Sequence, residues 1–264
     1  MVVDLRAATA TGVRMFLNVE AFVGGSATDT LFGPDATTAW QITGMNAGLA
    51  GTAAFSNFEN LVGGVSDDTF QFGDGKAVTG TIDGGAGLNA LDYSPCTVSV
   101  NVNLAKGAAT GVGRVTNFRD ITGGSGADLL IGDDDDNVLI GGPGDDLILG
   151  LRGRDILVGG LGADLLDGGE DDDLLLNGTT SYDGAPANLA GVRAEWRRTD
   201  VDYATRIAHL RGELNGGLNG SVELTASTVF DDYDVDWLLG EAGQDWFWSP
   251  LAELIDQVAG EQVK

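Results

Sequence analysis

The sequence predicts an all-β chain whose central part is a stack of short strand-turn units, and three observations point to this fold. Gly accounts for 42 of the 264 residues, about twice its usual share of a globular chain. The acidic residues are 31 Asp and only 9 Glu, and Asp favours turns over helices. The third observation is an internal period of nine residues, which is typical of solenoid proteins.

The first part of the chain, residues 1–122, is predicted to be a region of β-strand repeats. The segments 16–31, 55–70 and 115–130 share an Asn, an apolar residue, a Gly-Gly pair and an Asp in a fixed register. Between them lie stretches of alternating polarity such as 97–104, which are typical of half-buried strands. The shared Asn residues are Asn18, Asn57 and Asn117.

The second part, residues 123–176, consists of six consecutive nonapeptides: GGSGADLLI, GDDDDNVLI, GGPGDDLIL, GLRGRDILV, GGLGADLLD and GGEDDDLLL. The first position is always Gly and the eighth is always Leu or Ile. The sixth position carries Asp128, Asn137, Asp146, Asp155, Asp164 and Asp173. A single unit cannot bury its apolar side, so successive units are expected to coil and stack.

The pattern changes after Asn177. Five of the 14 basic residues fall within 193–211, where apolar residues recur every three to four positions. This spacing predicts two short amphipathic helices in residues 177–215. Thr199 and Asp202 are expected to form a capping box for the second helix.

The last part, residues 216–264, is predicted to return to β structure. Two degenerate nonapeptides occupy 231–248, with Asp236 and Asp245 at their sixth positions. The closing segment, 251–264, is expected to form one more short helix. The aromatic residues of the degenerate nonapeptides are expected to form the core of the last coil rather than a sugar-binding or partner-binding platform. They are Trp237, Trp246, Phe247 and Trp248.

Charge and composition exclude several classes of function. The formal net charge of −26 repels nucleic acid and anionic membranes, and favours metal cations or basic partners. Cys96 stands alone and forms no internal disulfide. His209 is the single histidine, which excludes two-histidine zinc motifs; we expect a surface or packing role for it. No apolar run approaches the roughly 18 residues of a membrane span, and the start of the chain does not resemble a signal peptide.

The nonapeptide turns offer hard oxygen ligands. Gly at the first, second and fourth positions is expected to adopt positive φ and expose successive carbonyl oxygens along one edge. The sixth-position Asp adds a carboxylate, and calcium takes about six to eight such oxygens in a tolerant geometry. Residues 123–176 hold 13 Asp, one Glu and two Arg, a net charge of −12. We therefore expect Ca²⁺ to neutralise this block.

The nonapeptide pattern G-G-x-G-x-D-x-U-x resembles that of the repeats-in-toxin (RTX, hemolysin-type calcium-binding repeat) family of secreted bacterial proteins. The resemblance implies a parallel β-roll, a β-solenoid in which two nonapeptides make one coil. Several calcium ions would then lie between sixth-position residues two units apart, with Asp173 at the end of the series. The site of Asn137 and Asp155 is expected to be the weakest, because Asn replaces Asp.

The pattern and the resemblance together imply a set of metal-binding residues. These residues come from the turns of the six nonapeptides and from the degenerate nonapeptides at 231–248. They are Asp128, Asn137, Asp146, Asp155, Asp164, Asp173, Gly124, Gly126, Gly142, Gly144, Gly153, Gly160, Gly162, Asp236 and Asp245.

A wider likeness to the ends of large repeat-containing surface or secreted bacterial proteins implies a fragment, or a shortened relative, of a larger extracellular protein. From the repeats we expect a calcium-binding structural module, not an enzyme, that folds on Ca²⁺ binding outside the cell. The chain would leave through a type I secretion apparatus without an N-terminal signal peptide, guided by a signal in 216–264. Residues 177–215 would form a small cap, laying their apolar side over Leu166 and Leu175. A surface protein or a polysaccharide is the candidate partner.

The alternative is the C-terminal accessory part of a secreted enzyme, such as a polysaccharide-modifying β-helix, a protease or a lipase. Its catalytic domain would be absent or would lie in residues 1–122, which contain no histidine and no recognised catalytic motif. A groove with converging Asp residues would favour this alternative.

Overall fold

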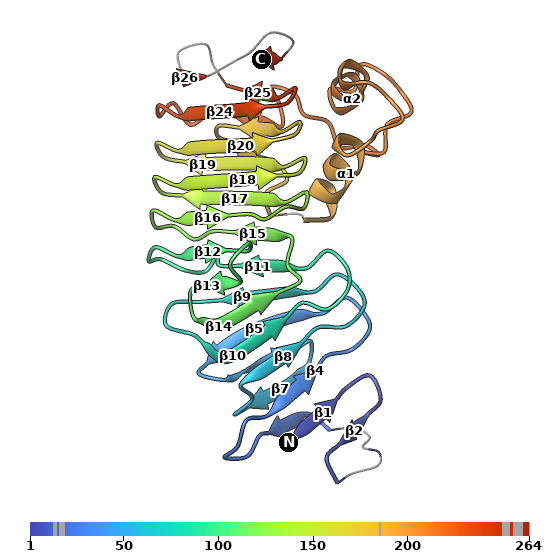
Figure 1. Ribbon diagram of the computed structural model, residues 1–264, viewed down its shortest axis with the longest axis vertical. Helices are drawn as coiled ribbons and strands as arrows, with labels where there is room; N and C mark the ends of the chain where they lie inside the picture. The colour runs from blue at the N-terminus through green and yellow to red at the C-terminus, as the bar shows by residue number, and fades with distance from the viewer. Residues whose placement is uncertain (13–14, 16–18, 185, 250–253, 256–260, 264) are drawn as a thin grey trace. The chain divides into compact units, whose positions relative to one another are not determined.

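The computed structural model describes residues 1–12, 15, 19–184, 186–249, 254–255 and 261–263 (Figure 1). The chain divides into two compact units, Met1–Gly126 and Ala127–Lys264. Most of the regular structure in both is β. Among the described residues, no helix has the length and apolar character needed to cross a membrane.

The unit Met1–Gly126 contains short strands. Their bounds are β1 Val2–Asp4, β2 Thr9–Ala10, β3 Ala21–Val23, β4 Thr30–Phe32, β5 Ala39–Gly44, β6 Ala47–Ala50, β7 Ala53–Ser56, β8 Asn60–Val62, β9 Thr69–Phe72, β10 Val78–Asp83, β11 Ala90–Asp92, β12 Asn101–Asn103, β13 Ala108–Ala109, β14 Val112–Thr116 and β15 Asp120–Thr122. Parallel pairing links β1, β4, β8, β10 and β14, and separately β5, β9, β11 and β15. Antiparallel pairs, such as β5 with β6 and β12 with β13, interrupt this order.

Aromatic side chains fill the core of this first unit. Trp40 and Phe70, on the paired strands β5 and β9, stack with ring centroids 5.0 Å apart. Phe118 meets Phe70 edge-on at 5.5 Å. Such large buried rings supply apolar burial that requires no bound ion.

The shared Asn residues of the upstream repeats have a backbone role. Asn57 and Asn117 adopt φ of 58° and 60°, a left-handed conformation that Asn tolerates better than most residues. Asn18 lies outside the described residues. The Asn therefore marks a turn that enters the following strand.

Backbone N–H groups satisfy the buried carboxylate of Asp68 in the first unit. The Oδ1 atom of Asp68 accepts from Thr38 N at 2.8 Å and its Oδ2 atom accepts from Gly64 N at 2.7 Å. Asn89 Oδ1 in turn accepts from Asp68 N at 2.9 Å. Protein donors thus occupy both carboxylate oxygens of Asp68, so this turn needs no cation.

The unit Ala127–Lys264 contains strands and two helices. Their bounds are β16 Leu129–Ile131, β17 Val138–Pro143, β18 Leu147–Arg152, β19 Ile156–Leu161, β20 Leu165–Glu170, β21 Leu174–Leu176, β22 Thr179–Thr180, α1 Pro186–Trp196, α2 Tyr203–Leu210, β23 Val229–Phe230, β24 Trp237–Ala242, β25 Trp246–Trp248, β26 Leu254–Ile255 and β27 Gln262–Val263. Successive nonapeptide strands alternate between two parallel sheets (Figure 1). We name these sheet A (β16, β18, β20, β24, β26) and sheet B (β17, β19, β21, β25, β27).

The register of both sheets confirms that two nonapeptides make one coil. Leu129 pairs with Leu147 in sheet A, and the same separation of eighteen residues recurs in sheet B. After a long excursion the register resumes, because Leu165 pairs with Trp237 and β21 pairs with β25. The degenerate nonapeptides at 231–248 therefore continue the stack, as predicted.

Both predicted helices form, but the cap of the second differs from the prediction. The N-cap of α2 is Asp202, whose side chain accepts from Thr205 N at 2.8 Å. Thr199 was expected in that role and does not take it. The helix begins later, so the carboxylate of Asp202 binds a free N–H of the first turn.

The helices cover the side of sheet B, and the prediction that they lie over Leu166 and Leu175 is wrong. Trp196, Ile207 and their neighbours form one cluster with the seventh- and ninth-position side chains of sheet B, such as Ile156 and Val158. Eighth-position side chains point the other way because strand side chains alternate. The strands β24 and β25 instead extend the sheets beyond β20 and β21.

The end of the chain also differs from the prediction. In the segment 251–264 the described residues form two short strands, β26 and β27, which pair with β24 and β25. The rest of that segment, 251–253, 256–260 and 264, lies outside the described residues. For His209, the sequence left a surface or a packing role open; the side chain is buried, in agreement with a packing role, and its Nδ1 atom lies 2.6 Å from Glu195 Oε1.

We predict that Asp68→Ala lowers the free energy of unfolding of the first unit by about 2–4 kcal/mol, because two buried N–H groups lose their acceptors. Asp35→Ala, at an exposed position, should change it by less than about 0.5 kcal/mol. Urea unfolding in the presence of chelator measures both. Equal effects of the two substitutions would contradict the role assigned to Asp68.

Candidate metal centre

The sixth-position residues form two hydrogen-bonded ladders, one along each edge of the stack. In each ladder the Oδ1 atom accepts from the backbone N–H of the sixth-position residue one coil earlier. The pairs, donor first, are Asp128 and Asp146 (2.7 Å), Asn137 and Asp155 (2.7 Å), Asp146 and Asp164 (2.8 Å), Asp155 and Asp173 (2.8 Å), Asp164 and Asp236 (2.7 Å), and Asp173 and Asp245 (2.7 Å). Asp173 is therefore an inner member, and its expected place at the end of the series is wrong.

The second carboxylate oxygen of these residues has no hydrogen-bond partner in the part of the chain that the structure describes. The atoms concerned are the Oδ2 atoms of Asp146, Asp155, Asp164, Asp173, Asp236 and Asp245. None of the six residues is more than 3% exposed. An unpaired buried carboxylate oxygen is costly, and bound cations are a common compensation. The Oδ2 atoms thus fit a cation.

Burial changes the acid–base chemistry of the ladder. Desolvation raises the pKa of Asp146 to about 7, and the nearby charge of Asp128 adds to the effect. The same cause raises the pKa of Asp155 and of Asp164 to about 8 and raises that of Asp173 well above its usual value. Without a cation, the carboxylates disfavour their charged form at neutral pH.

The first-position glycines make room for the ladder. A Cβ atom on Gly150 would collide with Asp155 Oδ2 and Gly168 O, and Gly141 has the same relation to Asp146 and Gly159. These glycines do not adopt left-handed φ, so that part of the prediction is wrong for the first position. Their requirement is steric.

In the third to sixth nonapeptides the second and fourth positions adopt positive φ, as predicted. The predicted site residues that show it are Gly142 (101°), Gly144 (134°), Gly153 (108°), Gly160 (118°) and Gly162 (123°). A Cβ atom on Gly160 would also collide with the carbonyl oxygen of Gly142, one coil earlier. Turn carbonyls are therefore stacked closely along the edge where the carboxylates lie.

Some predicted site residues depart from this geometry. Gly124 and Gly126 belong to the first unit, lie beside Cys96 and Ser99, and do not adopt positive φ. Asn137 differs from the Asp residues because its Oδ1 accepts from Asp133 N at 2.9 Å. This contact gives a physical reason for the predicted weakness of the Asn137 and Asp155 site.

The fifth position holds a second row of acceptors that the sequence analysis missed. Asp136 Oδ1 accepts from Arg154 N at 2.8 Å, and Asp145 Oδ1 accepts from Ala163 N at 3.1 Å, each across one coil. Asp172 makes the corresponding bond to Gln244 N at 3.0 Å. The available signal was Asp at the fifth position in three of the six units.

Side-chain ligands alone do not complete a site. Within the described ranges, no three His, Cys, Asp or Glu side chains converge on one point. A calcium ion here would combine sixth-position carboxylates with the stacked turn carbonyls, which are the hard oxygens that calcium prefers.

Comparison with protein families decides what this pattern is. Residues 122–157 and 140–175 match the model of the RTX calcium-binding nonapeptide repeat (4 copies). Residues 122–175 are RTX calcium-binding repeats. Such repeats bind Ca²⁺. No curated protein matched the chain.

The geometry of residues 122–175, which we call the RTX block, is suited to a bound Ca²⁺. Among the described residues, the Oδ2 atoms of Asp146, Asp155, Asp164 and Asp173 have no hydrogen-bond partner, and the first-position glycines keep that space clear of Cβ atoms. When bound, Ca²⁺ supplies positive charge to the carboxylates. The chain's own contribution is to hold the carboxylates at fixed positions through the Oδ1 hydrogen bonds and to exclude water from them.

We predict that Gly150→Ala weakens calcium binding by at least about tenfold, because the new Cβ displaces the Asp155 carboxylate. Calorimetric titration measures the loss. Gly184→Ala is the control, since a Cβ there meets nothing within 4 Å. If both variants bind like the parent chain, the space above Gly150 is not part of the site.

The raised pKa values predict an unusual pH dependence for the metal-free protein. A pKa of about 8 in the folded state for Asp155 and Asp164, against about 3.9 unfolded, gives stability that is present in acid. That stability is complete below about pH 4 and is lost progressively as pH rises towards about 8. With chelator present, the β signal in circular dichroism should therefore be stronger at pH 5.5 than at pH 8.5.

Excess calcium should reverse that dependence, because Ca²⁺ binds the deprotonated carboxylate. A metal-free β signal that grows with pH would show that burial does not control these groups.

Proposed function

We propose that the chain is a non-enzymatic, calcium-binding structural module of a secreted or cell-surface bacterial protein, and that its repeats fold as a β-roll when Ca²⁺ binds outside the cell. The observation that carries the proposal is the row of buried Oδ2 atoms that have no hydrogen-bond partner within the described part of the chain. In water-excluded surroundings, such a row stabilises the fold only when cations neutralise it.

Support for the β-roll comes from the alternation of strands between sheets A and B with a coil of eighteen residues. Support for a C-terminal cap comes from two features. The helices α1 and α2 cover the side of sheet B, and β24 to β27 extend both sheets. In this proposal the cap therefore covers both the side of sheet B and the end of the stack.

Support for an extracellular location is chemical. Extracellular calcium modules bind at about 10⁻⁴ to 10⁻³ M, a concentration range that the cytosol does not supply. The chain has one Cys, so calcium takes the stabilising role that disulfides have in many secreted domains. Export through a type I secretion apparatus, with a signal in 216–264, follows from the resemblance to secreted RTX proteins. Retention of a chain ending at Asn177 in a host that exports the full chain tests it.

The proposal predicts that chelator abolishes the β signal of the repeats in the full chain near neutral pH, and that Ca²⁺ restores it whereas equal Mg²⁺ does not. Mg²⁺ demands a stricter octahedral geometry than stacked turns provide. Circular dichroism beside calorimetric titration measures folding and binding together. A spectrum unchanged by chelator would overturn calcium-dependent folding.

A matched pair of substitutions sharpens the test. Asp164→Asn removes an inner ladder charge between Asp146 and Asp236, and should weaken binding by at least about tenfold. Asp134→Asn removes the same charge from an exposed turn position, and should leave binding nearly unchanged. Equal loss in both would mean that calcium is held only by the net charge of the block.

A further inference from the structure

The excursion after Asn177 separates two ladder residues that lie side by side in the fold. Asp173 N donates to Asp245 Oδ1 at 2.7 Å, although the two residues are 72 positions apart in the sequence. The preceding pair on the same edge, Asp155 and Asp173, is 18 positions apart. An unstructured loop about four times longer lowers the probability that its ends meet by about eightfold. The excursion therefore needs contacts that hold its two ends together.

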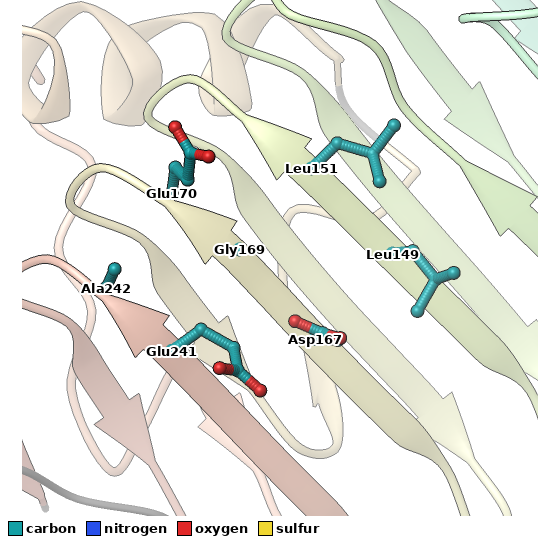
Figure 2. A pocket seen from close by; sticks show the side chains of 7 residues that line it. All are labelled: Leu149, Leu151, Asp167, Gly169, Glu170, Glu241 and Ala242. Atoms are coloured by element: carbon teal, nitrogen blue, oxygen red, sulfur yellow. The ribbon is translucent and has the colours of Figure 1, made fainter.

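The two ends are the turns 168–173 and 240–245, which we name the junction turns. Their first halves pair on the neighbouring strands β20 and β24, where Gly169 lies opposite Glu241. Figure 2 shows both residues beside the pocket that β18, β20 and β24 line. Backbone pairing thus holds the first halves of the junction turns together.

Aromatic residues of the two helices link the second halves of the junction turns. Trp196, the last residue of α1, is fully buried, and its Nε1 donates to Asp172 O at 2.8 Å. Tyr203, the first residue of α2, donates its hydroxyl to Asp245 O at 2.6 Å. The two rings meet edge-on with centroids 5.9 Å apart. One aromatic pair therefore connects one junction turn to the other.

Arg206 strengthens this connection. Its buried guanidinium pairs with the Asp172 carboxylate and donates from Nη1 to Trp196 O at 2.7 Å. It also lies over the Trp196 ring, 4.8 Å from the centroid. The other carboxylate oxygen of Asp172 accepts from Gln244 N, in the second junction turn, at 3.0 Å. Asp172 is thus fixed by a helix and by the neighbouring turn, and it directly precedes the ladder residue Asp173.

The corresponding pair at the other edge of the stack offers an internal reference. Asp164 N donates to Asp236 Oδ1 at 2.7 Å, and these residues are also 72 positions apart. Here the turns supply a link of their own, because Gly162 N donates to Asp232 Oδ2 at 2.6 Å. The bonds that Trp196, Tyr203 and Arg206 donate to turn residues end in the junction turns.

We propose that Trp196, Tyr203 and Arg206 are positioning residues for a calcium site between the carboxylates of Asp173 and Asp245, which we name the junction site. They hold the two junction turns in register across the excursion. Less ordering then has to accompany binding of the ion, and such preorganisation raises affinity. The inference rests on the proposed function, since it takes the ladder carboxylates as calcium ligands.

The test is a double-mutant cycle in the full chain, measured by calorimetric titration with Ca²⁺. Tyr203→Phe keeps the ring and removes the hydroxyl that binds Asp245 O. It should lower the calcium affinity by about threefold to tenfold, as expected for one hydrogen bond, both in the parent chain and in an Asp236→Asn chain. In an Asp245→Asn chain the junction site is already impaired, so the same substitution should lower the affinity by less than about twofold.

Matched variants control for general effects of these substitutions. Tyr93 is a buried residue of the other unit whose hydroxyl also donates to a backbone carbonyl, so Tyr93→Phe should leave the calcium affinity unchanged. Arg206→Met should repeat the pattern of Tyr203→Phe. Arg152→Met, which removes the exposed partner of Glu170, should not.

Equal losses of affinity in the Asp236→Asn and Asp245→Asn chains would show that Tyr203 has only a structural role, and would overturn the proposal. So would a Tyr203→Phe chain that binds calcium as the parent does, or one whose β signal in circular dichroism falls short of the parent's in saturating calcium. Each of these results leaves the proposed function standing, because the parent chain still binds calcium. A parent chain that binds no calcium contradicts both.

Discussion

The stacking of one coil on the next, at the usual strand spacing of roughly 4.8 Å, is the constraint on which the second unit depends. That spacing places each sixth-position carboxylate against the backbone N–H of the previous coil, which binds Oδ1 and leaves Oδ2 buried. The Leu and Ile side chains that drive the stacking therefore create a row of buried negative charge. A divalent cation that binds oxygen resolves this conflict, so calcium affinity and folding are coupled.

The two units stabilise the buried carboxylates of their turns in different ways. In the first unit, Gly64 N binds Asp68 Oδ2, and large aromatic side chains such as Trp40 and Phe70 fill the core. In the RTX block no donor from the residues that the structure describes reaches the corresponding Oδ2 of Asp164. Hydrogen bonds thus close the turns of one unit, whereas the other reserves its carboxylates for an ion. Calcium removal should consequently act on the second unit and spare the first.

Much of the repeat geometry was predictable because a strict nine-residue period has few structural solutions. The period and the family pattern together placed Asp146 one coil from Asp164 and predicted the return of the register at 231–248. The covering of sheet B was not predictable, because the seventh and ninth positions carry similar apolar residues in both sheets, such as Leu149 and Val158. Which sheet the helices cover depends on where the excursion after Asn177 leaves the stack. The steric role of Gly150 was also missed, because its collisions with the Asp155 carboxylate of the same unit and with Gly168 O one coil away depend on the folded path of the chain.

Amide hydrogen exchange of the full chain, resolved by segment with and without calcium, tests the central claim most directly. With calcium, the amides of 138–176 should be strongly protected, and removal of the ion near neutral pH should release them to nearly the rate of an unfolded chain. The strands around Trp40 and Phe70 should remain protected in both conditions. Equal protection of 138–176 with and without calcium would contradict the account.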